Sequence, residues 1–341
     1  MTKKKILMVM RKYHGIGGHD TVINNLCIGL NEIGYDTHIG AFSFIQDPPK
    51  NLKKIKLNKL NLFSSHIDGV KFDVIHSHET SMNYYSIFNK SKFVFHYHGA
   101  NGTLQKYNLK LSLLLCKNNI SKIISVSKSA SEHLKFISHR IPIDVIYNGV
   151  DTSFFNSELS QDNRLGNPQL LFVGNLSSYK NVGKIIDAMS FIIKQFPSAH
   201  LQIVGAGDDY NHLKEKIISK QLENHVKLVG KLEQNELRFR YSSCDLYVSA
   251  SSLEAHPVPI FEAMACGKPV VLSAIPAHKE LISMSKAGRI FSTNNPFEIC
   301  EKICEVYSLR HALAKTSKEF VQKYDWSLVC KNVSKIYDEL I

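Results

Sequence analysis

Residues 246–272, LYVSASSLEAHPVPIFEAMACGKPVVL, hold the local pattern that predicts the fold. The apolar runs at 246–248 and 270–272 have the length and composition of buried strands. Between them, Pro259 precedes an apolar helical segment, Ile260–Cys266, and Gly267 follows it, as expected just after a helix end. A strand, a helix and a second strand in this order predict two parallel strands joined by a crossover helix.

The same alternation continues along the chain. Strands are expected at 6–10, 38–42, 73–76, 93–96, 123–126 and 145–146, and then at 170–173, 201–204, 226–228, 246–248, 270–272 and 289–291. Helices are expected at 20–33, 81–89, 104–117 and 129–137, and then at 182–195, 210–220, 234–241, 260–266 and 296–307. Two such series predict an α/β chain with two doubly wound, Rossmann-like domains, 1–160 and 161–325, joined by the polar stretch 157–167. Ligands of such sheets bind beyond the carboxyl ends of the strands, so two facing domains would form a cleft.

Composition excludes several classes of protein. The chain has 341 residues, enough for two domains of about 150 residues, and no apolar run approaches the roughly 18 residues of a membrane span. Its seven cysteines are odd in number and contain no C-x-x-C pair, which argues against a disulfide framework or a zinc knuckle. We therefore expect a cytoplasmic protein.

The net charge of +12 lies mainly in the first half, because residues 1–160 carry 20 basic and 11 acidic side chains. Five of these lysines fall within 50–59. Such an excess predicts an anionic partner for this half: a membrane surface, nucleic acid or a phosphorylated substrate. Nucleic acid is not expected, since aromatic residues do not alternate with the lysines. Peripheral attachment to the inner face of the membrane is the expectation, although a solvated lysine-rich face would explain the charge equally well.

A glycine-rich turn, HGIGGHD at 14–20, follows the first strand. It is not a dinucleotide fingerprint, because Asp20 stands at the last glycine position, and no P-loop motif occurs in the chain. Backbone N–H groups of Gly17 and Gly18 at a helix N-terminus suit a phosphate group, although a tight turn alone also favours glycine.

Paired histidines, 76 with 78 and 96 with 98, stand at the ends of two expected strands. Residues i and i+2 share one face of a strand, so the four imidazoles could converge on a metal ion. Because no carboxylate or thiolate completes the set, we expect no metal, with one histidine facing a polar cleft and another packed in the strand.

Two glutamates carry the clearest chemical signal. Glu254 lies in the loop after one expected strand, and Glu262 lies in the first turns of the helix that follows Pro259. The backbone N–H groups between them suit an anion, so the pair fits a ligand with two sugar rings and a diphosphate between them. Two solvated carboxylates are the alternative.

With its surroundings, this segment resembles the retaining glycosyltransferases of family 4, also called group 1, which have the two-domain GT-B architecture. The family's donor-site signature is matched by Glu254 and Glu262 with AMACGKPVV at 263–271. Further matches are Gly17-Gly18, YNGVD at 147–151, FVGNL at 172–176 with Lys180, IVGAG at 203–207 and YDWS at 324–327. The resemblance implies that the terminal helix, 326–341, packs back toward the first domain.

The resemblance also implies roles for individual residues. Glu254, Lys180 and His98 would be catalytic: Glu254 beside the transferred sugar, Lys180 on the diphosphate and His98 near the acceptor. Glu262 would hold the ribose, and the remaining donor-binding positions would be Asn175, Gly205, Gly207, Lys231, Leu232, Val258 and Ile260. Gly17, Gly18 and Asp20 would lie on the phosphate and acceptor side.

Three departures from the family pattern weaken the expected phosphate pocket. Asn175 stands where arginine is frequent, and Asp20 replaces a glutamate. His256-Pro257 replaces Phe-Gly, and Pro259 has no N–H to offer a phosphate.

The resemblance predicts transfer of a sugar, with retention, from a nucleoside-diphosphate sugar to a glycan or lipid-linked acceptor. It calls for no cofactor and no metal. A weakly active sugar-nucleotide or glycan-binding protein, or a hydrolase or epimerase of sugar nucleotides, is the alternative.

Overall fold

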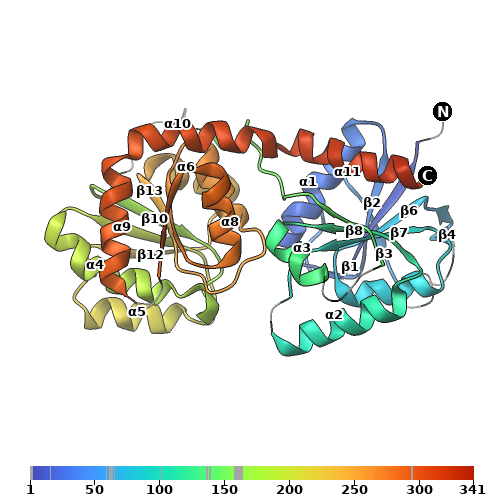
Figure 1. Ribbon diagram of the computed structural model, residues 1–341, viewed down its shortest axis with the longest axis horizontal. Helices are drawn as coiled ribbons and strands as arrows, with labels where there is room; N and C mark the ends of the chain where they lie inside the picture. Colours follow the sequence, from blue (N-terminus) through green and yellow to red (C-terminus); the bar gives the residue numbers. More distant parts are fainter. Residues whose placement is uncertain are drawn as a thin grey trace. The chain divides into compact units, whose positions relative to one another are not determined.

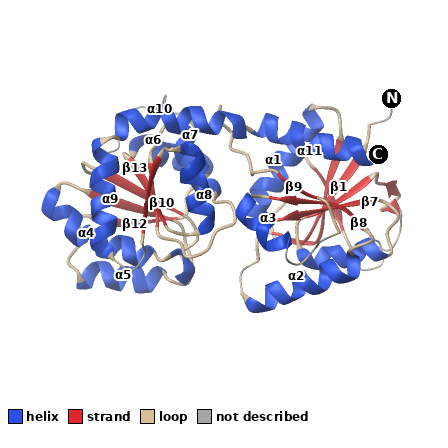
Figure 2. Ribbon diagram, viewed as in Figure 1, coloured by secondary structure: helices blue, strands red, loops and turns tan. Residues whose placement is uncertain are grey.

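The computed structural model describes residues 3–15, 17–58, 60, 64, 66–100, 102–135, 137, 140–156, 164–292 and 295–341. Its contacts divide the chain into two compact units, residues 1–149 with 326–341 and residues 150–325. The sequence predicts a boundary at 160–161 within a linker, of which residues 157–163 lie outside the described part. Both units are layered α/β structures (Figures 1 and 2).

The first unit contains a seven-stranded parallel sheet of order β3-β2-β1-β6-β7-β8-β9 among the described residues. Its elements are β1 (Lys5–Tyr13), α1 (Gly18–Glu32), β2 (Asp36–Phe44), β3 (Lys53–Lys56), β4 (His66–Ile67), β5 (Val70–Lys71), β6 (Val74–Ser77), η2 (Thr80–Ile87), β7 (Lys92–Tyr97), α2 (Thr103–Cys116), β8 (Ile120–Ser125), α3 (Lys128–Lys135), β9 (Ile143–Val145) and α11 (Trp326–Leu340). β4 and β5 form a separate antiparallel pair.

Alternate side chains of β1 point to opposite faces of this sheet, and different helices cover the two faces. Ile6 and Met8 pack in one apolar cluster with residues of α1 and α11, whereas Leu7 and Val9 pack in another with residues of η2, α2 and α3. Successive strand residues point to opposite faces, so both faces of the sheet are buried. α11 thus belongs to the core of this unit, where Trp326 lies against Gly149: a Cβ atom on Gly149 would come within 2.5 Å of the indole.

The second unit repeats this design with a six-stranded parallel sheet of order β12-β11-β10-β13-β14-β15. Its elements are β10 (Gln169–Val173), η3 (Ser178–Lys180), α4 (Val182–Gln195), β11 (His200–Val204), α5 (Tyr210–Ser219), β12 (Val226–Gly230), α6 (Gln234–Ser243), β13 (Leu246–Ser249), α7 (Val258–Ala265), β14 (Val270–Ser273), α8 (Pro276–Ser285), β15 (Gly288–Phe291), α9 (Pro296–Ser308), α10 (Arg310–Val321) and η4 (Gln322–Tyr324). Its main core lies between the sheet and α4, α5 and α9.

The predicted doubly wound α/β class is confirmed, and each expected strand lies in or beside an observed one. The helix expected at 81–89 is wrong in type, because η2 is a 3₁₀ helix. Its polar Thr-Ser-Met-Asn-Tyr-Tyr-Ser sequence lacks the apolar stripe of an amphipathic α-helix. α8 and α10 were not predicted. No described helix is both long and apolar enough to cross a membrane.

Candidate functional site

Three loops at the carboxyl edge of the second sheet form one layered cradle. The N–H of Gly174 donates to the Val204 carbonyl, and the N–H of Gly205 donates to the Gly230 carbonyl. Gly205 has φ 141°, and a Cβ atom there would lie 1.9 Å from the Gly174 carbonyl oxygen. Gly207 has φ 158°, and its Cβ would lie 2.2 Å from the Leu176 carbonyl oxygen. Only glycine allows this close approach of the loops after β10 and β11.

The same edge carries the other expected base- and phosphate-binding positions. Asn175 is exposed in the loop after β10. Lys231, which is exposed, and Leu232, which is half-buried, follow directly after β12. The loops that carry these three residues flank the loop after β11, since β11 lies between β10 and β12 in the sheet.

Lys180 and Glu254 form an ion pair at this edge, with their side chains only 16% and 13% exposed. The loops that carry them are joined by backbone contacts. The Ser252 N–H donates to the Tyr179 carbonyl at 2.8 Å, and the Asn181 side-chain amide donates to the Ala250 carbonyl at 3.1 Å. The cation and the carboxylate are thus fixed together, although 74 positions separate them in the sequence.

Glu262 lies on α7 and accepts a hydrogen bond of 2.7 Å from the hydroxyl of Tyr241, a buried residue of α6. Burial raises the pKa of Glu262 to about 7, and the hydrogen bond from Tyr241 partly opposes that rise. The carboxyl group is therefore poised to change charge near neutral pH, as is frequent at functional sites. Tyr241 could not be predicted from the sequence, because its contact depends on the packing of α6 against α7.

The expected phosphate-binding N–H groups at the start of α7 are fewer than predicted. Pro259 has none, and the N–H of Ile260 donates to the Pro257 carbonyl at 3.1 Å. The amide proposed at Ile260 is thus engaged in the first turn of the helix. Val258, the first residue of α7, makes no backbone hydrogen bond from its N–H within the described part of the chain.

Two further histidines lie in this region of the second unit. His256 packs on Phe261, with ring centroids 4.2 Å apart, and burial lowers its pKa to about 3. It therefore serves as a neutral aromatic group where the family pattern has phenylalanine. His278, which the sequence did not single out, bonds Ser273, and its pKa is lowered to about 4, mainly by burial and in part by the charge of Lys180.

In the first unit, the glycine turn opens α1 as expected. The N–H of Thr21 donates to the Gly17 carbonyl at 3.0 Å, and Gly17 itself has φ 145°. The Asp20 carboxylate is buried and accepts from the N–H of His14 at 3.3 Å, so it holds the turn closed.

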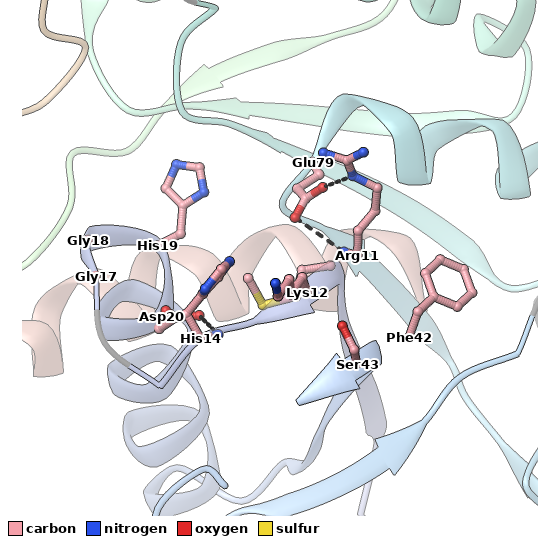
Figure 3. A pocket seen from close by; sticks show the side chains of 11 residues that line it. Arg11, Lys12, His14, Gly17, Gly18, His19, Asp20, Phe42, Ser43 and Glu79 are labelled. Atoms are coloured by element: carbon pink, nitrogen blue, oxygen red, sulfur yellow. Dashed lines mark hydrogen bonds and ion pairs between the residues drawn. The ribbon is translucent and has the colours of Figure 1, made fainter. Parts of the chain in front are cut away.

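A pocket of about 670 Å³ adjoins this turn. Its lining includes Gly17, Gly18 and Asp20, together with Arg11 and Glu79. Figure 3 shows Arg11 joined to Glu79, whose carboxylate accepts from the Arg11 Nε at 2.7 Å. The predicted phosphate and acceptor residues thus line one cavity of the first unit, which contains both basic and acidic groups.

Five histidines stack beside this pocket: His19, His76, His78, His96 and His98. Centroids of neighbouring rings lie 4.4–5.3 Å apart. The rings at 76, 78 and 96 are buried, and that at 98 is half-buried. Burial lowers the pKa of His76 to about 3 and places those of His78 and His96 well below the usual value. His76, His78 and His96 therefore converge as neutral rings.

Hydrogen bonds order this stack from its buried end. Tyr337 of α11 bonds the Nδ1 of His76 at 2.5 Å. Nε2 of His78 lies 3.4 Å from the Met8 sulfur, and Nδ1 of His78 lies 3.0 Å from Nε2 of His98. A neutral imidazole has one donor and one acceptor nitrogen. Because thioether sulfur only accepts, Nε2 of His78 donates to it, and Nδ1 of His78 then accepts from Nε2 of His98.

Nitrogens of His76, His78 and His96 all lie within 4.8 Å of one another, close enough to be considered as metal ligands. A tetrahedral zinc ion with bonds of about 2.0–2.1 Å needs nitrogens roughly 3.3 Å apart. The set contains three imidazoles and no carboxylate or thiolate. The rings would have to leave their stack to bind such an ion.

Comparison with known proteins decides the family. Residues 155–323 match the family described as Glycosyl transferases group 1, and residues 16–154 match Glycosyltransferase Family 4. The chain belongs to the group 1 glycosyltransferases. An uncharacterized glycosyltransferase of Methanocaldococcus jannaschii is 28% identical over 360 residues, covering 98% of both chains.

A further relative matches a shorter part of this glycosyltransferase. Phosphatidyl-myo-inositol mannosyltransferase of Mycobacterium leprae is 26% identical over 57% of the chain and 52% of its own length. Two solved structures share the fold: Anabaena HepE in complex with UDP and glucose (TM-score 0.83, 19% identity, 98% and 100% coverage) and Thermosynechococcus elongatus sucrose-phosphate synthase (0.81, 18%, 99% of each). The predicted family, GT-B fold and glycosyltransferase activity are thereby confirmed.

Proposed function

We propose that this glycosyltransferase takes its sugar from a nucleoside-diphosphate sugar and transfers it with retention of configuration. The paired Lys180 and Glu254 carry the proposal, because a diphosphate leaving group needs a cation and a transferred sugar needs a nearby carboxylate. Both stand at the carboxyl edge of a doubly wound sheet, where such folds bind ligands.

The donor would be held by the second unit. Glu262 would accept hydrogen bonds from the ribose hydroxyls, and the glycine cradle at 205–207 with Lys231 and Leu232 would contain the base. Lys180 and the Val258 N–H would carry the diphosphate. HepE is reported in complexes with UDP, with UDP and glucose and with UDP-glucose, so a uridine donor is the first to test.

The chemical step breaks the bond between the anomeric carbon and the diphosphate oxygen, and the acceptor oxygen bonds that carbon on the same face. The leaving oxygen keeps the electron pair, and its charge is compensated by Lys180. We assign the acceptor proton to His98. Because Nε2 of His98 donates its proton to His78, Nδ1 of His98 is the nitrogen that would take the acceptor proton. No metal is required for this step.

The acceptor is proposed to be a glycan or a lipid-linked molecule at the inner face of the membrane. A phosphatidyl-myo-inositol mannosyltransferase among the relatives supports a lipid acceptor, and the pocket beside Gly18 provides a place for polar groups.

A panel of UDP-, GDP- and ADP-sugars tests the donor by thermal shift. Ligand at about 100 times its Kd stabilises the folded chain by roughly 2.7 kcal/mol, so the correct donor should stand out. Proton NMR of the product then reports the anomeric configuration. Inversion, or hydrolysis that added acceptors leave unchanged, would contradict the proposal.

A further inference from the structure

Helix α2 exposes an apolar stripe on its outer surface. Leu104, Tyr107, Leu111, Leu114 and Leu115 are 82%, 66%, 38%, 59% and 53% exposed. At about 100° per residue these five side chains fall within an arc of roughly 100°. The opposite side of the helix, with Leu109, Leu113 and Cys116, is buried in the core of the first unit. α2 therefore has two apolar faces, of which the described residues of the first unit cover only one.

Lysines flank this stripe along one side. Lys106, Lys110 and Lys117 fall at neighbouring angles of the helix, between the stripe and the buried face. None of the three forms an ion pair with any residue that the structure describes. Residues 80–131 contain seven lysines and no acidic residue, so no carboxylate of this stretch balances their charge.

We propose that α2 is the surface by which the protein docks on an anionic lipid bilayer. The exposed leucines and Tyr107 would enter the boundary between headgroups and acyl chains, and the lysines would contact anionic headgroups. The inference stands without the proposed donor chemistry, and a lipid-linked acceptor would be presented at the same surface.

Charge decides between a bilayer and a second copy of this chain. Two α2 helices packed stripe to stripe in antiparallel order would bring both sets of three lysines to the same side, and α2 has no carboxylate to balance them in either order. Like charges opposed across an interface disfavour association. An anionic bilayer satisfies both the apolar stripe and the lysines.

This surface replaces the lysine cluster at 50–59 as the candidate for membrane attachment. Lys53 is paired with Asp36 at 2.6 Å, and Lys54 is paired with Asp47 at 2.5 Å. Lys59 lies outside the described residues. The cluster is thus partly neutralised and its strand, β3, belongs to the sheet.

Co-sedimentation of the full chain with vesicles tests the proposal. The vesicles are phosphatidylcholine alone or phosphatidylcholine mixed with anionic phosphatidylglycerol, each at low and high salt. The apolar variant is L104S/L114S/L115S and its matched control is L165S/I218S/L309S. The charge variant is K106Q/K110Q/K117Q and its matched control is K214Q/K279Q/K335Q.

We expect binding to the anionic vesicles at low salt, at least tenfold weaker for the apolar and charge variants and unchanged for both controls. High salt should weaken binding of the wild type. Y107W should show bromolipid quenching of its fluorescence on the anionic vesicles, measured against the parent, whose single Trp326 is buried.

Three outcomes would overturn the proposal: no binding of the wild type, equal binding of the apolar variant, or a dimer in sedimentation equilibrium that this variant abolishes. Melting curves verify that each variant is folded. The donor-induced thermal shift should persist in the apolar variant, so that failure of docking and failure of the proposed transfer are separate results.

Discussion

The Lys180 ammonium donates to the Glu254 carboxylate, and both side chains are largely buried. Each group therefore compensates the charge of the other. Removing one partner of a largely buried pair leaves an uncompensated charge, which costs more than the pair itself contributes. In the proposed function a diphosphate shares or replaces this contact, so the pair would link donor binding to the chemistry.

We expect K180A and E254Q each to lower kcat by roughly 100-fold, the scale for losing one preorganised group in a transition state. Their effects should be less than multiplicative in the double variant, because the two residues contact each other. Steady-state kinetics on the set measures both effects. K216A removes a similar but remote pair with Asp187 and should leave kcat unchanged. An unaltered kcat in E254Q would remove that residue from the mechanism.

Glu262 should act on donor binding instead. A hydrogen bond to a charged group contributes about 1.5–3 kcal/mol, so E262Q should raise the donor KM by roughly 10- to 100-fold. The change in kcat should be small, because the ribose contact is the same in ground and transition states. A large fall in kcat at constant KM would place Glu262 beside the reacting carbon.

The donor KM should also depend on pH through this carboxyl. Since the pKa of Glu262 is raised to about 7, the carboxylate that accepts from the ribose is lost as pH falls below 7, and KM should rise. Y241F removes the hydrogen bond that opposes the rise in pKa, so its midpoint should move to higher pH. E262Q should abolish this pH dependence, which a KM profile from pH 5.5 to 8.5 would reveal.

The buried histidines should make the fold sensitive to acid. His76 has its pKa lowered to about 3 by burial, so between pH 3 and 6.5 the unfolded state binds a proton that the native state does not. Its contribution is fully present above pH 6.5 and is lost as pH falls, by about 2 kcal/mol at pH 5. H76N keeps a partner for Tyr337 but cannot titrate. The slope of its free energy of unfolding against pH should be smaller than that of the wild type by the equivalent of one bound proton.

Close packing of the glycine loops provides a test of the donor cradle. G205A would place a methyl group 1.9 Å from the Gly174 carbonyl oxygen, so the loops must separate. We expect a lowered Tm and loss of the donor-induced thermal shift. G34A is the control: Gly34 has φ 102° but open space around it, so it should cost only about 1–2 kcal/mol and spare donor binding. Donor binding retained in G205A would show that the cradle is not part of the site.

Local pattern in the sequence was sufficient for the fold. Every strand of the two sheets except β3 contains or adjoins a short apolar run that can be recognised without the tertiary structure. β3, with the sequence KKIK, was missed because lysines outnumber its single buried residue, Ile55. η2 was misjudged because a polar 3₁₀ segment has no apolar stripe. α10 was missed because it buries only Ser317, Phe320 and Val321.

Contacts between residues far apart in the chain could not be predicted from the sequence. The bond from Tyr241 to Glu262 and that from Tyr337 to His76 join residues 21 and 261 positions apart, and no local pattern carries them. The hydrogen bond from the Ile260 N–H to the Pro257 carbonyl could not be predicted either, because it depends on the backbone conformation of the first turn of α7. The glycines at 205 and 207 could be assigned to a cradle, whereas their contact with the loop after β10 appears only in the structure.

The histidine stack supplies the last prediction: transfer should survive removal of divalent metal. His76, His78 and His96 are buried neutral rings within 4.8 Å of one another, and a bound zinc ion would require their nitrogens at roughly 3.3 Å. The ring stack and the bond from Tyr337 oppose that rearrangement, and the set has no carboxylate to balance the charge of an ion. Activity after exhaustive dialysis against EDTA should match the untreated enzyme, and elemental analysis should find less than one zinc per chain. Turnover that disappears on chelation and returns with zinc, but not in H96Q, would make the stack a metal site and the metal-independent mechanism wrong.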